Sequence, residues 1–359
     1  MLLIIPFHIP YISGKENEYI ANVIAKKSFS GIGDYHHKAI QLLKGLTKVE
    51  SIYLTTSCTS ALEIAALALD IQTGDEVILP SFTFVSTANA FALRGAKLLF
   101  ADIDEHSLNI SLQEIERLTT ANTKAIVVVH YNGYSDNISQ IKEFAQNNNI
   151  FLIEDAAQAI NGYCNNEHLG TFGDIGCISF HETKNIHCGE GGCILVNNQN
   201  LIDKIEHIIE KGTNRLDFLK SKTKFYEWKD LGFSADMDEI RAAFLTAQLE
   251  DIQKVTNQRM RNLLHNLSQL QNVPNRLQPD YLPTEKYFAQ TNAHILWGLS
   301  KNREQLIQNF KTAGITVYSH YTPLHLSSFG KQFYESPLPV TEKVSRQIVR
   351  FPVHTKFSI

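Results

Sequence analysis

Short hydrophobic runs alternate with helical patterns from about residue 50 to residue 200. Each run is nearly continuous in hydrophobic residues, which is typical of strands that are buried on both faces. The sequence therefore predicts an α/β fold in which helices cover both sides of a mostly parallel sheet. The predicted strands are SIYLT (51–55), EVILP (76–80), AKLLFADI (96–103), KAIVVVH (124–130), NIFLIEDA (149–156), CISFH (177–181) and GCILV (192–196).

The last third of the chain has a different pattern. Residues 236–270 are continuously helical in spacing, and a proline-bearing loop follows at 272–286. A second α+β region then contains AHILWGLS (293–300), a helix at 303–314 and ITVYSHY (315–321). With 359 residues, the chain is long enough for about two domains. We expect a large domain at 1–245, which includes the N-terminal segment, and a smaller C-terminal α+β domain at 246–359.

Charge and cysteine content exclude several classes of function. Lys and Arg number 33 against 37 Asp and Glu, for a net charge of −4 without a basic block, so neither nucleic acid nor a membrane is an expected partner. No hydrophobic run approaches the roughly 20 residues that span a bilayer, and the start MLLIIPFHIPYISG lacks the basic region of a signal peptide. The five irregularly spaced cysteines indicate reduced thiols and a cytoplasmic protein. His187, Cys188 and Cys193 form no C-x-x-C pair, so no metal site is expected.

Hydroxyl residues stand where the first strand turns into a helix, in TTSCTSALE (55–63). The free N–H groups at a helix N-terminus attract phosphate, and Ser57 and Thr59 can add hydroxyl donors. The alternative is an ordinary helix cap. The chain has no G-x-x-x-x-G-K-[ST] motif, and Gly31-Ile-Gly33 does not complete G-x-G-x-x-G, so a nucleotide loop is not indicated.

Two more candidates follow predicted strands. Asp155 ends the strand of EDAAQA (154–159), and a buried carboxylate there needs a cation such as a protonated pyridine nitrogen. The alternative is an acidic helix cap. Phe82 or Phe84, in PSFTFVSTANAF (80–91), could stack on a planar ring, and the alternative is aromatic packing in the core.

One lysine, Lys184, lies in a polar loop between the last two strands, within SFHETKNIHCGEGG (179–192). Partial burial of such an amine lowers its pKa and suits imine formation, whereas the alternative is a solvated lysine. Ser179 and His181, two residues apart, share one face of an extended run. A phosphate cup, a carboxylate, a stacking ring and an imine-forming lysine together indicate pyridoxal 5′-phosphate (PLP), which acts as an electron sink.

These residues carry a clear resemblance to the DegT/DnrJ/EryC1/StrS family of sugar-nucleotide aminotransferases, which are PLP-dependent transferases of fold type I. The resemblance implies a mostly parallel seven-stranded sheet in the large domain. It covers nearly the whole chain and includes TSCTSALE, GDEVILPSFTFVSTANAF, RGAK, VVVHY, EDAAQA, LGTFGDIGCISFHETKN, GEGG, EKGTNR, NAH, HYTPLH and LPVTEKVSRQIVRFPV. The SFHETKN, EKGTNR and NAH stretches are similar to members that make dTDP-4-amino-4,6-dideoxygalactose.

The resemblance implies a role for each matching residue. Lys184 and Asp155 are the implied catalytic residues, the first binding the cofactor and moving a proton and the second binding the ring nitrogen. Cys58, Thr59 and Ser179 hold the phosphate, Phe84 stacks on the ring, and Gln158 lies over or beside the phenolic oxygen. Ser57 is a cofactor-binding candidate from its place at the helix N-terminus. His181, His320 and Tyr321 are implied sugar-nucleotide contacts, and Arg215 lies in a stretch near the partner subunit's site.

The implied reaction transfers an amino group from L-glutamate to C4 of a dTDP-4-keto-6-deoxyhexose, giving dTDP-4-amino-4,6-dideoxygalactose for a surface polysaccharide. The implied assembly is a homodimer with sites at the subunit interface. His181 and GEGG (189–192) resemble C4-aminating members, whereas amination at C3 and the gluco epimer stay open. A family dehydratase has histidine in place of the lysine, and a nicotinamide-linked oxidoreductase needs the missing glycine fingerprint. A PLP-retaining sensor without turnover is the non-enzyme alternative.

Two departures from the family pattern stand out. Many members have N-Y-R-M where this chain has Ser234-Ala235-Asp236-Met237, so we expect that contact to the partner's cofactor phosphate to be shortened or replaced. The chain also ends at VHTKFSI, where relatives usually continue with a final helix, so we expect a C-terminal tail of one helix to be missing or disordered.

Overall fold

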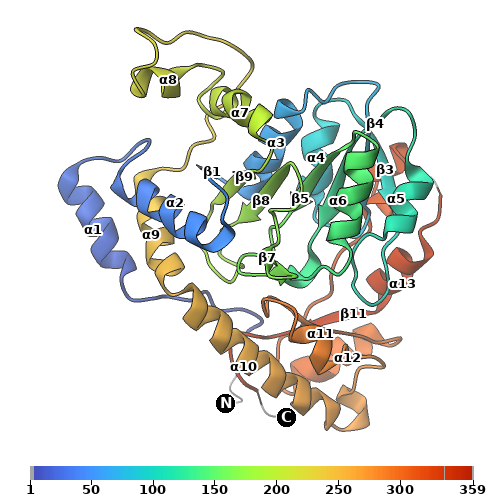
Figure 1. Cartoon of the computed structure of the whole chain (residues 1–359). Coiled ribbons are helices and arrows are strands. Elements are labelled where there is room, and N and C mark those ends of the chain that lie inside the picture. Colours follow the sequence, from blue (N-terminus) through green and yellow to red (C-terminus); the bar gives the residue numbers. More distant parts are fainter. Residues whose placement is uncertain (1–3, 335, 358–359) are drawn as a thin grey trace.

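A seven-stranded sheet forms the centre of the protein in the computed structural model, which describes residues 4–334 and 336–357 (Figure 1). The strand order is β1-β9-β8-β5-β4-β2-β3, and only β9 runs antiparallel to its neighbours. The predicted α/β fold with a mostly parallel sheet is confirmed. The strands are β1 (Ser51–Thr55), β2 (Glu76–Pro80), β3 (Lys97–Ala101), β4 (Thr123–Val129), β5 (Phe151–Asp155), β8 (Ile175–Ser179) and β9 (Gly192–Val196).

Helices cover both faces of this sheet, because successive side chains of each strand point to opposite sides. In β4, Ile126 and Val128 join one hydrophobic core, whereas Ala125 and Val127 join the other. The first core is completed by α2 (Asp34–Thr47), α5 (Leu112–Leu118), α6 (Ile138–Asn147) and α9 (Glu239–Glu250), and the second by α3 (Cys58–Ala68), α4 (Val85–Ala92) and α7 (Ile202–Ile209). Burial on both faces explains the uninterrupted hydrophobic runs in the sequence.

The C-terminal region has its own hydrophobic core, lined by residues from Leu263 to Phe357 together with four residues of the preceding chain. Its elements are α10 (Ile252–Gln271), α11 (Glu285–Phe288), α12 (Arg303–Thr312) and α13 (Pro339–Gln347), with a two-stranded antiparallel sheet of β10 (Leu296–Leu299) and β11 (Ile348–Phe351). Figure 1 shows this region, in orange and red, below the large sheet. The division at 245/246 falls inside α9, and it stays a prediction.

The segment ITVYSHY does not form a ladder strand. It makes two isolated bridges instead, Ile315 with Ile5 on one side and Tyr318 with Arg350 on the other. Its second half turns toward a cavity, which Tyr318, His320 and Tyr321 line. Strand pairing therefore stops where the side chains of residues 318–321 line the cavity.

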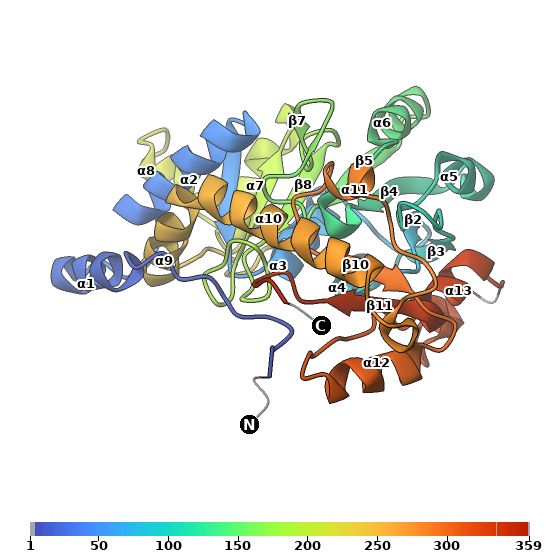
Figure 2. The same ribbon diagram turned by 90° about the horizontal axis from the view of Figure 1, so that it is seen from below.

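The N-terminal segment precedes α1 (Glu16–Lys26) and makes hydrogen bonds with both the C-terminal region and the large sheet region. The ring of His354 donates to the carbonyl of Pro6, while the ring of His8 donates to the carbonyl of Glu182. Figure 2 shows this segment as an extended run beside α10. His8 is therefore close to the loop that contains Lys184.

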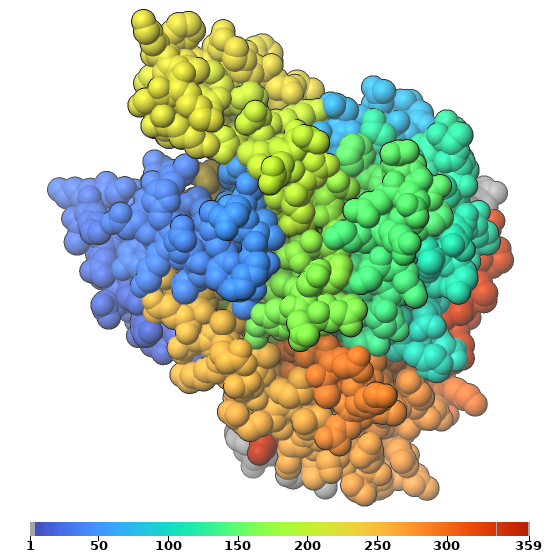
Figure 3. Space-filling view, in the orientation of Figure 1, coloured from blue at the N-terminus to red at the C-terminus, as the bar shows by residue number. Residues whose placement is uncertain are grey.

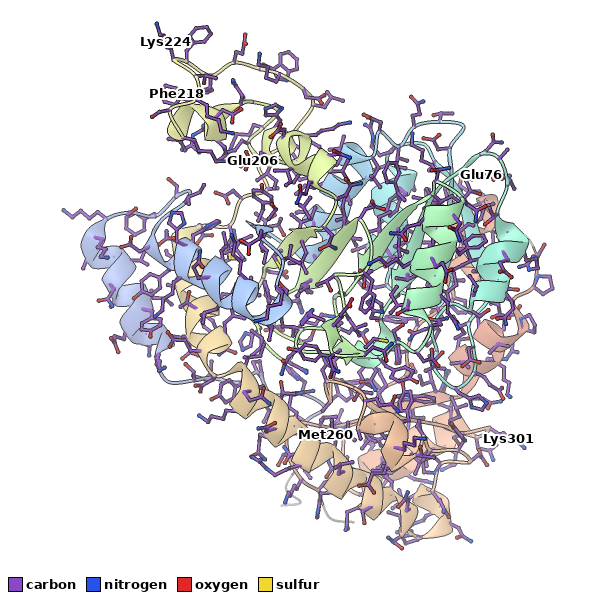
Figure 4. All side chains as sticks on the ribbon, in the orientation of Figure 1. Glu76, Glu206, Phe218, Lys224, Met260 and Lys301 are labelled. Atoms are coloured by element: carbon purple, nitrogen blue, oxygen red, sulfur yellow. The ribbon has the colours of Figure 1, made fainter. Side chains whose placement is uncertain are left out.

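An arm at residues 211–233, which contains α8 (Arg215–Leu219), projects from the body (Figure 3). Phe218 and Lys224 lie on it in Figure 4. Several of its large side chains are exposed, with Phe225 at 69% and Trp228 at 78% of full accessibility. The remaining short elements are β6 (Tyr163–Cys164), β7 (Glu167–His168) and the single turns η1 (Tyr131–Gly133), η2 (Gln199–Leu201), η3 (Asn275–Leu277), η4 (Leu324–Leu326) and η5 (Gly330–Gln332). In the described part of the chain, no helix has the length and hydrophobicity that a membrane crossing requires.

Candidate active site

A cavity of about 740 Å³ lies at the edge of the sheet where the parallel strands end. β1 and β8 both run antiparallel to β9, so they run in the same direction and end at this edge together with β5. All predicted site residues except Arg215 line the cavity: Ser57, Cys58, Thr59, Phe84, Asp155, Gln158, Ser179, His181, Lys184, His320 and Tyr321. The topology thus brings together side chains that are up to 264 positions apart in the sequence (321 minus 57).

The start of α3 forms one end of the cavity. Ser57 is extended, and its Oγ accepts a hydrogen bond of 3.0 Å from Ser60 N, which begins the helix. The first N–H groups of the helix have no intrahelical acceptor, so they are suited to bind a phosphate. Gly192 packs against this turn so closely that a Cβ atom would lie 2.5 Å from Cys58 N. A glycine is therefore required for β9 to approach the cup.

Asp155, the last residue of β5, is a buried carboxylate at the sheet edge. Its oxygens accept hydrogen bonds from Thr87 Oγ1 at 2.6 Å and from Ala157 N at 3.1 Å. Burial raises the pKa of Asp155, although these two bonds oppose the rise. No lysine, arginine or histidine of the described residues forms an ion pair with it. A protonated ring nitrogen would supply the missing cation.

Lys184 lies in a turn after β8, and its N–H donates to the carbonyl of His181 at 2.9 Å. Burial lowers the pKa of Lys184, and Cys58 and Asp155 oppose that shift. Its ammonium group has no carboxylate within ion-pair distance among the residues described. The amine is therefore easier to deprotonate than an exposed lysine, as a nucleophile requires.

The two candidate phenylalanines have different environments. Phe82 is only 1% accessible and packs against Tyr131 and Tyr321, so it belongs to the hydrophobic core. Phe84 lines the cavity and is 60% accessible. Of the two, Phe84 is the one that can reach a bound ring.

The opposite wall contains a connected set of aromatic and amide groups. Gln158 accepts a hydrogen bond from Asn132 N at 2.8 Å and donates to the hydroxyl of Tyr321 at 3.0 Å. The rings of Tyr321 and His320 stack at 3.9 Å, and His320 Nδ1 lies 2.9 Å from the hydroxyl of Tyr131. Burial, with a contribution from Arg350, lowers the pKa of His320 well below its usual value. These contacts therefore fix the side chains of this wall, and the ring of His320 is neutral.

The cavity is also lined by residues to which the sequence assigned no individual role: Phe7, His8, Glu190, Arg259, His294 and Arg350. Glu190 Oε1 lies 3.4 Å from His181 Nε2, which places both side chains at one side of the cavity. NAH and QIVRFPV contain His294 and Arg350, but no local pattern indicates that these distant positions meet.

The hydrogen bonds of neighbouring residues determine the tautomer of His294. The amide of Asn185 donates to the carbonyl of Asn292 at 2.9 Å, so its oxygen faces His294 Nδ1 at 3.0 Å. Nδ1 must therefore carry the proton, which leaves Nε2 as an acceptor. Burial, together with the charges of Lys184 and Arg259, lowers the pKa of His294 well below its usual value and keeps the ring neutral.

Arg215 lies outside this cavity. It begins α8 on the projecting arm, and its guanidinium pairs with Glu210 at 2.9 Å. A role of Arg215 at the site of a partner subunit stays a prediction. Ser234 to Met237 pack beside the phosphate cup, where Thr56 N donates to the carbonyl of Ala235 at 2.8 Å.

The residues present fit PLP. The cavity combines a helix N-terminus for the phosphate, a buried carboxylate without a cation and a lysine of lowered pKa, while the glycine at 192 lets β9 pack against the phosphate cup. The fold and this site define a PLP-dependent transferase of fold type I.

Comparison with known proteins identifies the family. Residues 10–358 match the DegT/DnrJ/EryC1/StrS aminotransferase family, and the chain belongs to that family. The chain is 30% identical to GDP-perosamine synthase of Escherichia coli O157:H7 over 97% of its length and 93% of the relative. It is 28% identical to dTDP-4-dehydro-2,3,6-trideoxy-D-glucose 4-aminotransferase of Saccharopolyspora spinosa, over 98% and 92%. The crystal structure of NtdA from Bacillus subtilis with bound cofactor PMP (pyridoxamine phosphate) matches with a TM-score of 0.84 and 25% identity, over 97% and 80%. The protein is accordingly a PLP-dependent sugar-nucleotide aminotransferase.

Proposed function

We propose that the protein transfers the amino group of L-glutamate to C4 of a dTDP-4-keto-6-deoxyhexose and releases dTDP-4-amino-4,6-dideoxygalactose. The observation that carries the proposal is the cavity itself, which contains the set of Lys184, Asp155 and the α3 N-terminus on one wall and His320 and Tyr321 on the other. The proximity of His181 to Glu190 of GEGG supports amination at C4, as does the similarity of SFHETKN, EKGTNR and NAH to enzymes that make this sugar.

The chain's own groups can perform the required proton transfers. PLP, when bound, supplies an electron sink for the bond broken at the amino acid Cα. Lys184 Nζ then removes the proton from that Cα, and in the second half of the cycle it returns a proton to C4 of the sugar. Asp155 is buried and accepts hydrogen bonds from Thr87 and Ala157. Its carboxylate would keep the ring nitrogen of bound PLP protonated. The stacked pair of His320 and Tyr321 positions the sugar and excludes water from this wall.

A GDP-linked 4-keto-6-deoxyhexose is a second candidate substrate. The 30% identity to a GDP-perosamine synthase over nearly the whole chain favours it. The stereochemistry at C4 depends on which face of the sugar meets Lys184, because an axial amine gives the galacto sugar and an equatorial amine the gluco sugar.

We also propose that two copies of the chain form the functional unit. The arm exposes Phe225, Tyr226 and Trp228, and an exposed cluster of aromatic side chains is typical of an interface. Arg215 on the same arm would then act at the partner's cavity. A mass measurement in solution checks this, and a monomer with full activity would contradict it.

The five cysteines are free and buried, which supports a reducing compartment such as the cytoplasm.

The proposal is tested by giving the PLP-loaded protein L-glutamate and one 4-keto-6-deoxyhexose at a time, linked to dTDP or to GDP. NMR of the product then identifies the aminated carbon and its configuration. We expect a 4-amino sugar with the galacto configuration from the dTDP substrate, at a higher kcat/KM than from the GDP substrate. A 3-amino sugar, a gluco product or a preference for GDP would each overturn the corresponding part of the proposal.

A further inference from the structure

Arg350 differs from the paired arginines on the surface of the molecule. Arg117, Arg303 and Arg346, all on surface helices, each pair with a glutamate. Arg350 lies on β11 at the cavity, and its guanidinium has no carboxylate within ion-pair distance in the part of the chain that the structure describes. Arg350 is partly buried, and a charge that is partly removed from water without a counter-charge is costly, so a ligand that supplies one would stabilise it.

The contacts of Arg350 leave part of its donor edge available. Nε and Nη2 both donate to the carbonyl of Ser319, at 3.2 and 3.0 Å. The ring of Phe7 covers the face of the guanidinium at 4.8 Å. Nη1 has no acceptor among the described residues and is not one of their fully buried atoms, and Arg350 lines the cavity. A guanidinium that is held by one carbonyl and one ring, with a free edge, is set to bind an oxyanion in its own plane.

Its surroundings add no negative charge. Arg350 is close enough to Lys184 for its charge to lower the pKa of that lysine further, and its other titratable neighbours are Tyr131, His320 and Tyr321. Burial keeps both tyrosines protonated by raising their pKa, and it keeps the ring of His320 neutral. Arg259, the other arginine at the cavity, is different because its guanidinium donates to two carbonyls, those of Ala293 and His294.

We propose that Arg350 is the anion-binding residue of the substrate site and holds a carboxylate or phosphate group of the substrate. This inference rests on the proposed function, in which both substrates are anionic: the amino donor carries carboxylates, and the sugar nucleotide carries a diphosphate. The two sources share the same chemistry, a planar or tetrahedral oxyanion that accepts hydrogen bonds from the guanidinium edge.

The test measures equilibrium binding to the PLP-loaded protein, with the cofactor phosphate already in its cup. Glutarate is the carboxylate probe and inorganic pyrophosphate the phosphate probe, each titrated by calorimetry. Arg350→Gln should weaken one of the two by about 10- to 100-fold, because a hydrogen-bonded charge is lost. Loss of glutarate binding assigns Arg350 to the amino donor, and loss of pyrophosphate binding assigns it to the nucleotide.

Two further variants keep the test decisive. Arg350→Lys retains the charge but not the fork, so it should lose less affinity than Arg350→Gln while keeping cofactor binding. Arg346→Gln removes an exposed arginine four residues earlier, and it should change neither affinity. The same proteins are compared in the separate half-reactions with L-glutamate and with the ketosugar, where the matching KM should rise more than kcat falls.

Unchanged affinities and unchanged half-reactions in both Arg350 variants would overturn the inference. That result is distinct from failure of the proposed function, in which the wild-type protein itself would aminate no sugar nucleotide. Thermal unfolding of each variant shows whether the loss of the Ser319 contacts alone has destabilised the chain. If Arg350→Gln fails to fold, the comparison of Arg350→Lys with wild type decides.

Discussion

The two walls of the cavity are built in different ways. One wall consists of strand ends and a helix start in the large sheet, and it contains Ser57, Asp155, Ser179 and Lys184. Each of these lies within a few residues of a regular element, so backbone geometry fixes its position. The other wall contains His294, the stacked pair of His320 and Tyr321, and Arg350, from segments that are brought together by the C-terminal core and the N-terminal run. We expect the first wall to hold the cofactor and the second wall to contact the substrate.

Lys184→Ala should have the largest effect, because it removes the only proposed proton carrier of the cofactor wall. We expect turnover to fall by at least about 10²–10⁴-fold, with the fold retained. Product formation measures the loss, and Lys311→Ala, at an exposed position of α12, is the control. A Lys184→Ala protein with nearly normal turnover would contradict the assignment of this wall to the cofactor.

Asp155→Asn should have the next largest effect. It leaves one acceptor oxygen where the carboxylate has two, one for Thr87 and one for Ala157, and it removes the buried charge. The loss of one partner of a buried charge pair costs about 3–5 kcal/mol, or roughly 10²–10⁴-fold in rate. Turnover and cofactor affinity should both fall. An effect confined to the KM for the sugar would instead place Asp155 with the substrate wall.

The same variant should change the pH dependence of cofactor capture. The amine of Lys184 reacts only when neutral, and burial lowers its pKa while Asp155 raises it. Wild-type apo-enzyme should therefore bind PLP covalently at a lower pH than a free lysine side chain does. Asp155→Asn removes the raising charge, so the acidic limb of the profile should move to still lower pH. Absorbance of the lysine-bound cofactor across a pH series measures this, and a shift to higher pH would contradict the electrostatic account.

Tyr321→Phe should have the smallest effect, and it tests the substrate wall. The change removes the hydroxyl that accepts from Gln158 but keeps the ring that stacks on His320. One hydrogen bond of about 0.5–1.5 kcal/mol corresponds to a loss of roughly 2- to 12-fold, which should appear in kcat/KM for the sugar nucleotide. Cofactor affinity should stay unchanged. Equal losses in both would show that the two walls are not separate.

The difference between the walls also explains what could be predicted from the sequence. Strands buried on both faces produce continuous hydrophobic runs, so the seven strands and the sheet class were predictable, with β8 starting two residues earlier than expected. Ser57, Asp155 and Lys184 were found because each adjoins such a run. Pattern alone left Phe82 and Phe84 open, because only the fold distinguishes a core ring from a cavity ring. ITVYSHY resembled a strand, but its bridges to Ile5 and Arg350 depend on contacts between distant segments. Arg350 and His294 were missed for the same reason.

The most direct test of the central claim is the absorbance spectrum of the PLP-loaded protein on addition of L-glutamate alone. If this cavity is an aminotransferase site, the visible band of the lysine-bound cofactor should disappear as the amino group is transferred, and the 4-keto-6-deoxyhexose nucleotide should restore it. The Lys184→Ala protein should show neither change at a comparable rate. A wild-type band that glutamate leaves unaltered, in protein that is folded and cofactor-loaded, would contradict the account and indicate a protein that retains PLP without turnover.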